Sequence, residues 1–197
     1  MSRLPAMALE HAILVALRER AGTGYELARR FDKSIGFFYG ASHQQIYRTL
    51  KRMTADGWID AEEVPGGPRG SRRVHSVSAL GAEVLRAWLA EPSAPPMLRD
   101  ELSVKIRGAA YGDLATLVAN VRERRALHET RLRGYLRMQA DDFPDPAALD
   151  GTPLHQYLVL RGGIRGEEML VSWYDEILAA LDPTGDPESP PQEGDRE

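Results

Sequence analysis

The stretch 42–78 constrains the fold most, because it combines a capped polar helix with two short strands around a basic, glycine-rich turn. The hydroxyl of Ser42 can accept from the free amides of a first helical turn, and Gln45, three residues later, completes a capping box. A helix is therefore predicted to begin near His43. The Asp-Gly pair at 56–57 ends it, because glycine tolerates the left-handed conformation just past a helix C-terminus.

The helix predicted after Ser42 has one apolar side and one polar side. A rotation of about 100° per residue places Ile46, Leu50 and Met53 in a single stripe that faces a core. The opposite side has no acidic residue before position 56 and consists of Gln44, Arg48 and Lys51, flanked by Gln45, Tyr47 and Arg52. Such side chains can reach base edges and phosphates in a DNA major groove. Judged alone, such a surface is more often a solvated helix face.

The residues that follow the helix favour nucleic acid. Residues 58–64 have the β-branched and aromatic character of a short strand, and 74–77 alternate as a half-buried return strand. The turn between the strands is rich in proline and glycine and carries Arg69, Arg72 and Arg73. Arginines on an exposed hairpin can neutralise DNA phosphates, although a solubilising loop has the same composition. Directly after a capped cationic helix, the hairpin is interpreted as the wing of a winged helix-turn-helix.

Further helices are predicted on both sides of this stretch. Apolar spacing predicts a helix over 7–18, and Thr23 with Glu26 forms a second capping box that opens the next one. An aromatic loop at 34–41 leads into the polar helix, and Ser78 caps a further helix after the strands. These helices would supply the scaffold of a helix-turn-helix.

The second half of the chain is predicted to be a helical dimerisation domain. Three prolines within 92–96 indicate a linker. Helices are predicted over 99–111, 113–139 and 153–181, and Asp113 is expected to cap the second. The second helix has an apolar stripe with near-heptad spacing that Arg125 interrupts, and His128 on that stripe is expected to be a core or interface histidine with one hydrogen bond. The last helix has apolar residues on more than one face, which a two-helix hairpin alone cannot bury. A second subunit is the expected cover, so we expect a homodimer.

The expected fold class is mainly α, with an N-terminal winged helix-turn-helix domain and a C-terminal antiparallel helical dimerisation domain. The predicted segments are a DNA-binding domain (1–92), a linker (93–98), the dimerisation domain (99–181) and a disordered acidic tail (182–197).

The composition fits a cytoplasmic protein and offers no catalytic chemistry. The 197 residues include no cysteine, which excludes disulfides and thiolate metal sites. There is no apolar run of about 18 residues and no signal-like N-terminus, so neither a membrane span nor secretion is expected. The net charge of −4 conceals a basic first half, since residues 1–98 carry 13 Lys and Arg against 10 Asp and Glu. No histidine has metal-ligand spacing, so no enzyme activity, metal or cofactor is expected.

Three segments resemble the winged-helix domain of PadR-type transcriptional regulators: AMALEHAILVALRERAGTGYELARRF, SHQQIYRTLKRMTADGWI and RRVHSVSALGAEVLRAWL. The proline linker and helical C-terminal region resemble the branch related to the virulence activator, so the resemblance covers 7–181. It implies dimers paired through the C-terminal helices, a recognition helix at 42–52 and a wing at 69–73. Many members of the family respond to small hydrophobic compounds such as phenolic acids or drugs. Two positions depart from the common pattern, with His75 in place of tyrosine and Ser78 in place of threonine.

The expected function is that of a dimeric, sequence-specific transcriptional regulator, a repressor, that reads a pseudo-palindromic operator in double-stranded DNA. We expect Gln44 and Arg48 to approach bases and the cations to hold phosphates, while Tyr47 fits a phosphate contact and packing at the stripe edge equally well. The full set of expected DNA contacts is Ser42, His43, Gln44, Gln45, Tyr47, Arg48, Lys51, Arg52, Arg69, Arg72 and Arg73. A winged-helix protein-interaction module without DNA binding is the alternative.

An aromatic or hydrophobic effector is a further expectation. The aromatic side chains that are candidates for lining its pocket are Trp88, Trp173 and Tyr174. Aromatic residues at helical spacing more often belong to an ordinary core, so packing is the competing interpretation of all three.

Overall fold

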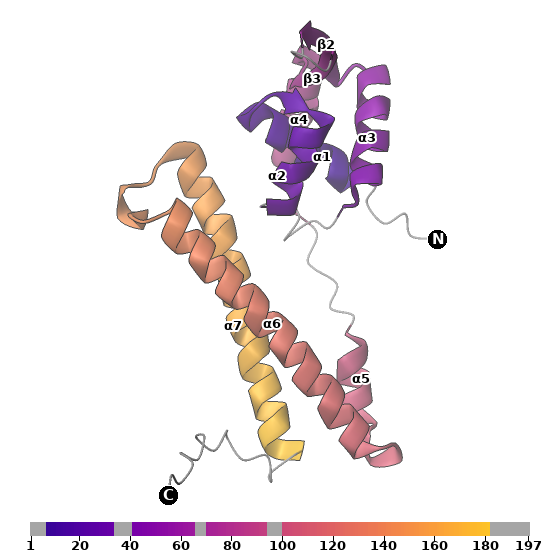
Figure 1. The fold of residues 1–197 in the computed structure, drawn as a ribbon, viewed down its shortest axis with the longest axis vertical. Coiled ribbons are helices and arrows are strands. Elements are labelled where there is room, and N and C mark those ends of the chain that lie inside the picture. Colours follow the sequence, from indigo (N-terminus) through magenta and orange to yellow (C-terminus); the bar gives the residue numbers. More distant parts are fainter. Residues whose placement is uncertain (1–6, 34–40, 66–69, 94–99, 182–197) are drawn as a thin grey trace, which may run out of the picture. The chain divides into compact units, whose positions relative to one another are not determined.

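The computed structural model describes residues 7–33, 41–65, 70–93 and 100–181. The chain divides between Pro95 and Pro96 into two compact units, unit 1 before the division and unit 2 after it (Figure 1). The division falls inside the proline-rich stretch predicted as a linker. Most of the aromatic loop predicted before Ser42, the tip of the arginine hairpin with Arg69, and the predicted acidic tail lie outside the described residues.

Unit 1 is a helical domain with a three-stranded antiparallel sheet in the order β1-β3-β2. Its elements are α1 (Met7–Glu19), β1 (Gly22–Thr23), α2 (Gly24–Lys33), α3 (His43–Ala55), β2 (Ile59–Pro65), β3 (Ser71–Val77) and α4 (Ala79–Leu89). The sequence predicts each of these except β1. Two residues are too few for a periodic pattern, and β1 exists only through its pairing with β3, in which Gly22 lies opposite His75 and Thr23 opposite Val74.

The core of unit 1 holds the apolar side of α3 in place. The stripe predicted on α3 is confirmed, since Ile46, Leu50 and Met53 are at most 2% exposed. These side chains pack against fully buried residues of the neighbouring elements, which are Ile13, Leu14, Leu27, Phe31 and Ile59. Burying a side chain of this size contributes about 1.5–3 kcal/mol. The packing therefore fixes which side of α3 is turned outward.

The start of α4 lies directly against the backbone at Trp58. The cap predicted at Ser78 is confirmed, since its hydroxyl accepts from the Gly81 amide at 3.0 Å and donates to the Gly57 carbonyl at 2.6 Å. The Ser78 amide donates to the Trp58 carbonyl at 3.1 Å. A Cβ atom on Gly81 would lie 2.0 Å from the Trp58 carbonyl oxygen. Only glycine fits at this contact, which the sequence pattern does not reveal.

Unit 2 is built on two long helices. Its elements are α5 (Glu101–Arg107), η3 (Ala109–Tyr111), α6 (Leu114–Asp142), η4 (Pro146–Ala148) and α7 (Gly151–Leu181). Helices α6 and α7 lie side by side as an antiparallel hairpin (Figure 1), and their contacts run in opposite directions along the chain, from the pair 125 and 175 to the pair 139 and 161. The predicted cap at Asp113 is confirmed by its bond from the Ala115 amide at 3.1 Å. None of the helices in the described ranges has the length and apolar character needed to cross a membrane.

The interior of the α6–α7 hairpin is apolar at both ends and polar in the middle. One apolar cluster contains Leu102, Leu117, Val121, Tyr174 and Ile177, and the other contains Tyr135, Leu160 and Ile164. Between them along both helices, His128 Nδ1 lies 2.6 Å from Glu167 Oε2, and both side chains are mostly buried. The prediction that His128 is a core histidine with a hydrogen-bond partner is confirmed.

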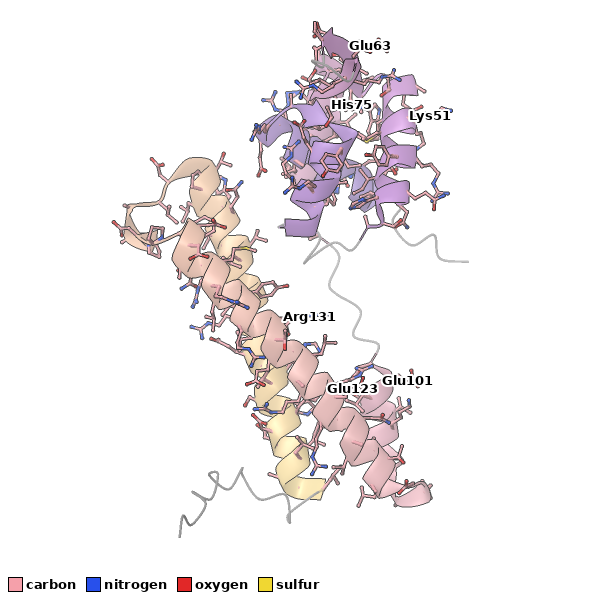
Figure 2. All side chains as sticks on the ribbon, viewed as in Figure 1. Lys51, Glu63, His75, Glu101, Glu123 and Arg131 are labelled. Atoms are coloured by element: carbon pink, nitrogen blue, oxygen red, sulfur yellow. The ribbon has the colours of Figure 1, made fainter. Side chains whose placement is uncertain are left out.

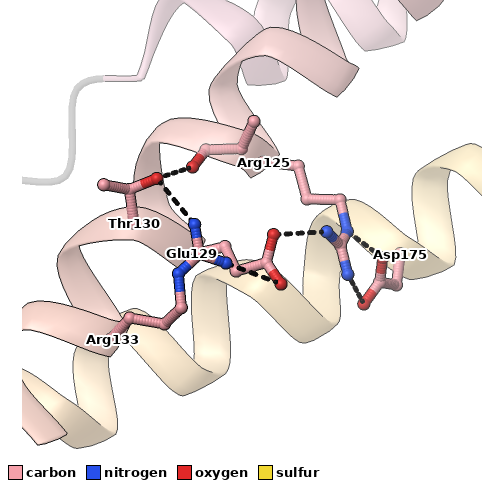
Figure 3. Close-up of polar contacts among 6 residues, drawn as sticks. Arg125, Glu129, Thr130, Arg133 and Asp175 are labelled. Carbon is pink, nitrogen blue, oxygen red and sulfur yellow. Dashed lines mark hydrogen bonds and ion pairs between the residues drawn. The ribbon is translucent and has the colours of Figure 1, made fainter.

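Arg125, which interrupts the predicted apolar stripe of α6, joins the two helices. Its guanidinium pairs with both carboxylate oxygens of Asp175 on α7 and with Glu129 one turn away, at 3.1 Å (Figure 3). Glu129 also pairs with Arg133 at 3.3 Å. The Asp175 side chain is half exposed, so water weakens the pair, and such surface pairs contribute about 0–1 kcal/mol. The contact therefore contributes more to the alignment of the helices than to stability.

Candidate nucleic-acid interface

The predicted capping box of α3 is present and fixes where the helix begins. The hydroxyl of Ser42 accepts from the Gln45 amide at 3.2 Å, and the Gln45 side chain accepts from the Ser42 amide at 2.8 Å. Two amides that a helix end leaves free are thereby satisfied reciprocally. The first turn, which carries His43 and Gln44, therefore has one defined start.

The outer side of α3 is exposed, polar and cationic, as predicted. Gln44, Arg48 and Lys51 are exposed and make no hydrogen bond or ion pair with the described part of the chain. Figure 2 shows Lys51 on the side of α3 that points away from unit 1. Ser42, His43 and Gln45 are exposed on the first turn. The side chains of Gln44, Arg48 and Lys51 are therefore available for hydrogen bonds with another molecule.

Arg52 differs from its neighbours because it is already paired inside unit 1. Its guanidinium contacts the carboxylate of Glu10 on α1, and that carboxylate is almost fully buried while the arginine side chain is 50% exposed. The second oxygen of Glu10 has no hydrogen-bond partner among the described residues. A buried carboxylate depends on its partner charge. The structure thus gives Arg52 a role in tying α3 to α1.

Tyr47 lies at the border between the outer face and the packed side of α3. Its side chain is 48% exposed. The ring lies over Gly24 at the start of α2, where a Cβ atom would be 2.5 Å from Tyr47 Cε1. Tyr47 therefore packs at the stripe edge and still keeps half of its surface available to a ligand.

The hairpin of β2 and β3 carries exposed cations next to acidic residues. The prediction that Arg72 and Arg73 lie on the turn is wrong, because β3 begins at Ser71 and its pairing with β2 continues to Pro65. Both arginines are exposed on β3, where Arg73 lies opposite Glu63 of β2. The hydroxyl of Ser71 donates to Glu63 at 3.3 Å. Glu63 therefore offsets part of the positive charge near Arg73, whereas Arg72 lies opposite the uncharged Val64.

The start of α2 connects the hairpin to the helices. The predicted capping box at Thr23 and Glu26 is confirmed, with the Glu26 carboxylate accepting from the Thr23 amide at 2.8 Å. This hydrogen bond and one from the Thr23 hydroxyl hold the pKa of Glu26 below its ordinary value, and the charges of Arg72 and Arg20 act in the same direction. Arg72 therefore lies within electrostatic reach of α2.

His75 is the buried titratable group of the hairpin. Burial lowers its pKa from 6.5, with a further contribution from the charge of Arg73, and its Nδ1 has no hydrogen-bond partner among the described residues. Below about pH 6.5 the unfolded chain therefore binds a proton that the folded chain resists.

We expect the stability of the protein to fall as the pH drops from 6.5 toward the lowered pKa of folded His75. In His75→Tyr, which lacks this titration, the fall between about pH 7 and 5.5 should be smaller. Urea midpoints at the two pH values measure it. Equal falls in the two proteins would contradict the assignment.

The three candidates for an effector pocket are each packed within their own unit. Trp88 on α4 stacks on His11, with ring centroids 4.4 Å apart and planes 7° from parallel. Tyr174 on α7 is 2% exposed in the first apolar cluster, beside Trp173. These contacts agree with the packing interpretation, and an effector pocket stays a prediction. Within the described ranges, no group of three or more histidine and acidic side chains is placed to hold a metal ion.

Comparisons with known proteins agree with this architecture along both units. Residues 13–87 match the transcriptional regulator PadR-like family, and residues 98–182 match the virulence activator alpha C-terminal family. A probable transcriptional regulator of Mycobacterium tuberculosis is 49% identical over 185 residues, which cover 89% of this chain and 98% of the relative. The negative transcriptional regulator PadR of Bacillus subtilis is 28% identical, with 88% and 97% of the two chains covered.

Two solved structures show the same fold over nearly their whole lengths. The virulence activator AphA of Vibrio cholerae superposes with a TM-score of 0.76 at 30% identity and covers 89% of this chain and 98% of its own. Bacillus subtilis PadR in complex with operator DNA gives a TM-score of 0.78 at 25% identity, with 89% and 99% covered. The chain belongs to the PadR-like family of DNA-binding transcriptional regulators.

Proposed function

We propose that this protein is a homodimeric, cytoplasmic repressor that reads a pseudo-palindromic operator with one α3 helix in each half-site. The observation that carries the proposal is the outer face of α3, where Gln44, Arg48 and Lys51 are exposed, lack partners in the described chain and have no acidic neighbour in the helix. Acidic side chains are acceptable on a helix face that only contacts water, but they would repel the phosphates of DNA. Repression, rather than activation, is supported by the similarity to the negative transcriptional regulator PadR of Bacillus subtilis.

The proposed contacts are of two kinds, those with the edges of DNA bases and those with the sugar-phosphate backbone of the DNA. Gln44 and Arg48 carry the amide and guanidinium groups that pair with adenine and guanine edges in a major groove. The other members are proposed to contact phosphates or sugar, and they are Ser42, His43, Gln45, Tyr47, Lys51, Arg72, Arg73 and, outside the described residues, Arg69.

The surface of unit 2 supports a second subunit. Large apolar side chains on it are exposed, with exposed fractions of 50% or more at Val104, Tyr111, Leu127, Leu158, Val159 and Met169. Several large apolar side chains left exposed on one helical domain favour burial against another copy. Pairing of two copies would present two α3 helices to one DNA duplex.

Selection of bound sequences from a random duplex pool tests the proposed function. We expect a recovered site with two related half-sites about one DNA turn, roughly 34 Å, apart. Repeating the selection with Arg48→Ala should relax the sequence preference at one position of each half-site. A protein that leaves every duplex unbound at low salt would instead be a protein-interaction module.

Arg72→Ala is expected to weaken binding to all duplexes and to lower the slope of log affinity against log salt by about one, because one phosphate contact is lost. Arg52→Ala is the matched comparison. Its guanidinium is already paired with Glu10, so we expect a loss of stability with an unchanged slope. Titrations at several salt concentrations measure both. A lowered slope for Arg52→Ala would return Arg52 to the phosphate contacts, and an unchanged slope for Arg72→Ala would remove the wing from them.

A further inference from the structure

Gly24, the first residue of α2, makes a close contact with the outer helix of the proposed interface. A Cβ atom at this position would lie 2.5 Å from Cε1 and 3.0 Å from Cδ1 of Tyr47, and 3.4 Å from Cδ1 of Leu50. Distances below 3.0 Å essentially never occur for a real Cβ, whereas 3.4 Å is an ordinary contact. Any side chain at Gly24 therefore displaces the Tyr47 ring and leaves Leu50 in place.

The backbone at Gly24 does not itself require glycine. The described glycines in the left-handed region are Gly57, Gly70 and Gly151, so alanine at Gly24 would meet no backbone strain of that kind. Near the start of a helix, alanine in place of glycine normally stabilises the protein, since the unfolded chain becomes less flexible. Among the contacts with described residues, those below 3.4 Å that disfavour alanine here are with the Tyr47 ring.

The exposed side of α3 leaves room for a displaced Tyr47 ring. Tyr47 is half exposed, and the side of α3 beneath it is filled by the buried Leu50 and Ile46. Its neighbours on the helix surface are Gln44, three residues before it, and Lys51, four residues after it. A shift of the ring would therefore crowd two of the side chains proposed to contact DNA.

The segment that carries Gly24 is also fixed to the wing. Gly22 and Thr23 pair with β3, and Thr23 is locked to Glu26 by the capping box. The Tyr47 ring therefore packs next to a segment that is paired with β3, the strand that carries Arg72 and Arg73. This arrangement relates the outer face of α3 to the hairpin through a contact that only glycine allows.

We propose that Gly24 is a positioning residue for DNA binding, which seats the Tyr47 ring and thereby sets the arrangement of Gln44, Tyr47 and Lys51 on the outer face of α3. The inference rests on the proposed function, since it assigns Gly24 a part in the same interface. Gly24 itself does not touch DNA in this arrangement and acts through Tyr47.

A double-mutant cycle on the full-length dimer tests the proposal. In Gly24→Ala we expect the affinity for the selected operator to fall by about tenfold, the scale of one displaced contact, while the thermal midpoint stays unchanged or rises. In the Tyr47→Ala background, Gly24→Ala should cause no further loss, because the ring that it displaces is absent. Gly134→Ala on α6, which has no atom within 4 Å of the added Cβ, is the control and should bind as the wild type does.

Each outcome separates the positioning role from the proposed function. If the wild type binds no duplex, the proposed function fails and this inference fails with it. If the wild type binds and Gly24→Ala binds equally well, the positioning role alone is overturned. The role is also overturned if Gly24→Ala loses affinity to the same extent with and without Tyr47, or if its loss accompanies a lowered thermal midpoint.

Discussion

Gly81→Ala is expected to destabilise unit 1 by about 3 kcal/mol, the upper end of the cost of overpacking. The added Cβ would lie 2.0 Å from the carbonyl oxygen of Trp58 and 2.9 Å from its carbonyl carbon. Both are backbone atoms, so no side chain can rotate away to make room. Relief requires α4 to move, which breaks the hydrogen bonds from Ser78 to the carbonyls of Trp58 and Gly57.

Urea unfolding measures the effect, and Gly134→Ala is the matched control. The same chemical change in the interior of α6 meets open space, and there alanine should stabilise the helix by about 0.5–1 kcal/mol. The two variants are therefore expected to shift the free energy of unfolding in opposite directions. A Gly81→Ala protein as stable as the wild type would contradict the close contact between Gly81 of α4 and the backbone of Trp58.

The elements of unit 1 follow from local signals in the sequence. Each capping box joins residues three positions apart, Thr23 with Glu26 and Ser42 with Gln45, and both form as predicted. The apolar stripe of α3 likewise repeats within one helix, so its buried side is confirmed. Such signals need no knowledge of the rest of the chain, which is why helix starts and faces are predictable.

The contacts that hold the elements against one another join distant positions. Arg52 and Glu10 are 42 residues apart, and Arg125 and Asp175 are 50 apart. In the sequence, Arg52 is one more cation on a polar helix face and Arg125 a defect in an apolar stripe. Their partners become visible only when the helices are packed.

In the candidate site, too, local features are predictable from the sequence and contacts between distant residues are not. Its exposed members, Gln44, Arg48 and Lys51, are predictable from the helical rotation alone. The glycines that permit close approach are not, since Gly24 gives only the signal of a helix start and Gly81 gives none. The sequence leaves open whether Tyr47 contacts phosphate or packs at the edge of the apolar stripe. The structure shows that its ring packs over Gly24.

Scrambling one half of the operator is expected to weaken binding by about 10²–10⁴-fold, the largest effect that the proposed dimer predicts. Once one unit 1 is bound, the second meets its half-site at the high effective concentration set by the dimer. We expect the α6–α7 hairpin to help keep the spacing between the two DNA-binding units of the dimer. The hairpin is held at both apolar clusters and by the pairs His128 with Glu167 and Arg125 with Asp175.

Operator duplexes that differ only at their centre separate spacing from sequence. An insertion of about five base pairs turns one half-site to the opposite face of the duplex, so we expect a loss as large as that from scrambling it. Sedimentation at the same concentrations should give twice the chain mass of 21.9 kDa. Equal affinity for the intact, scrambled and expanded duplexes would contradict a dimer that reads both half-sites, and would make each unit 1 an independent DNA-binding domain.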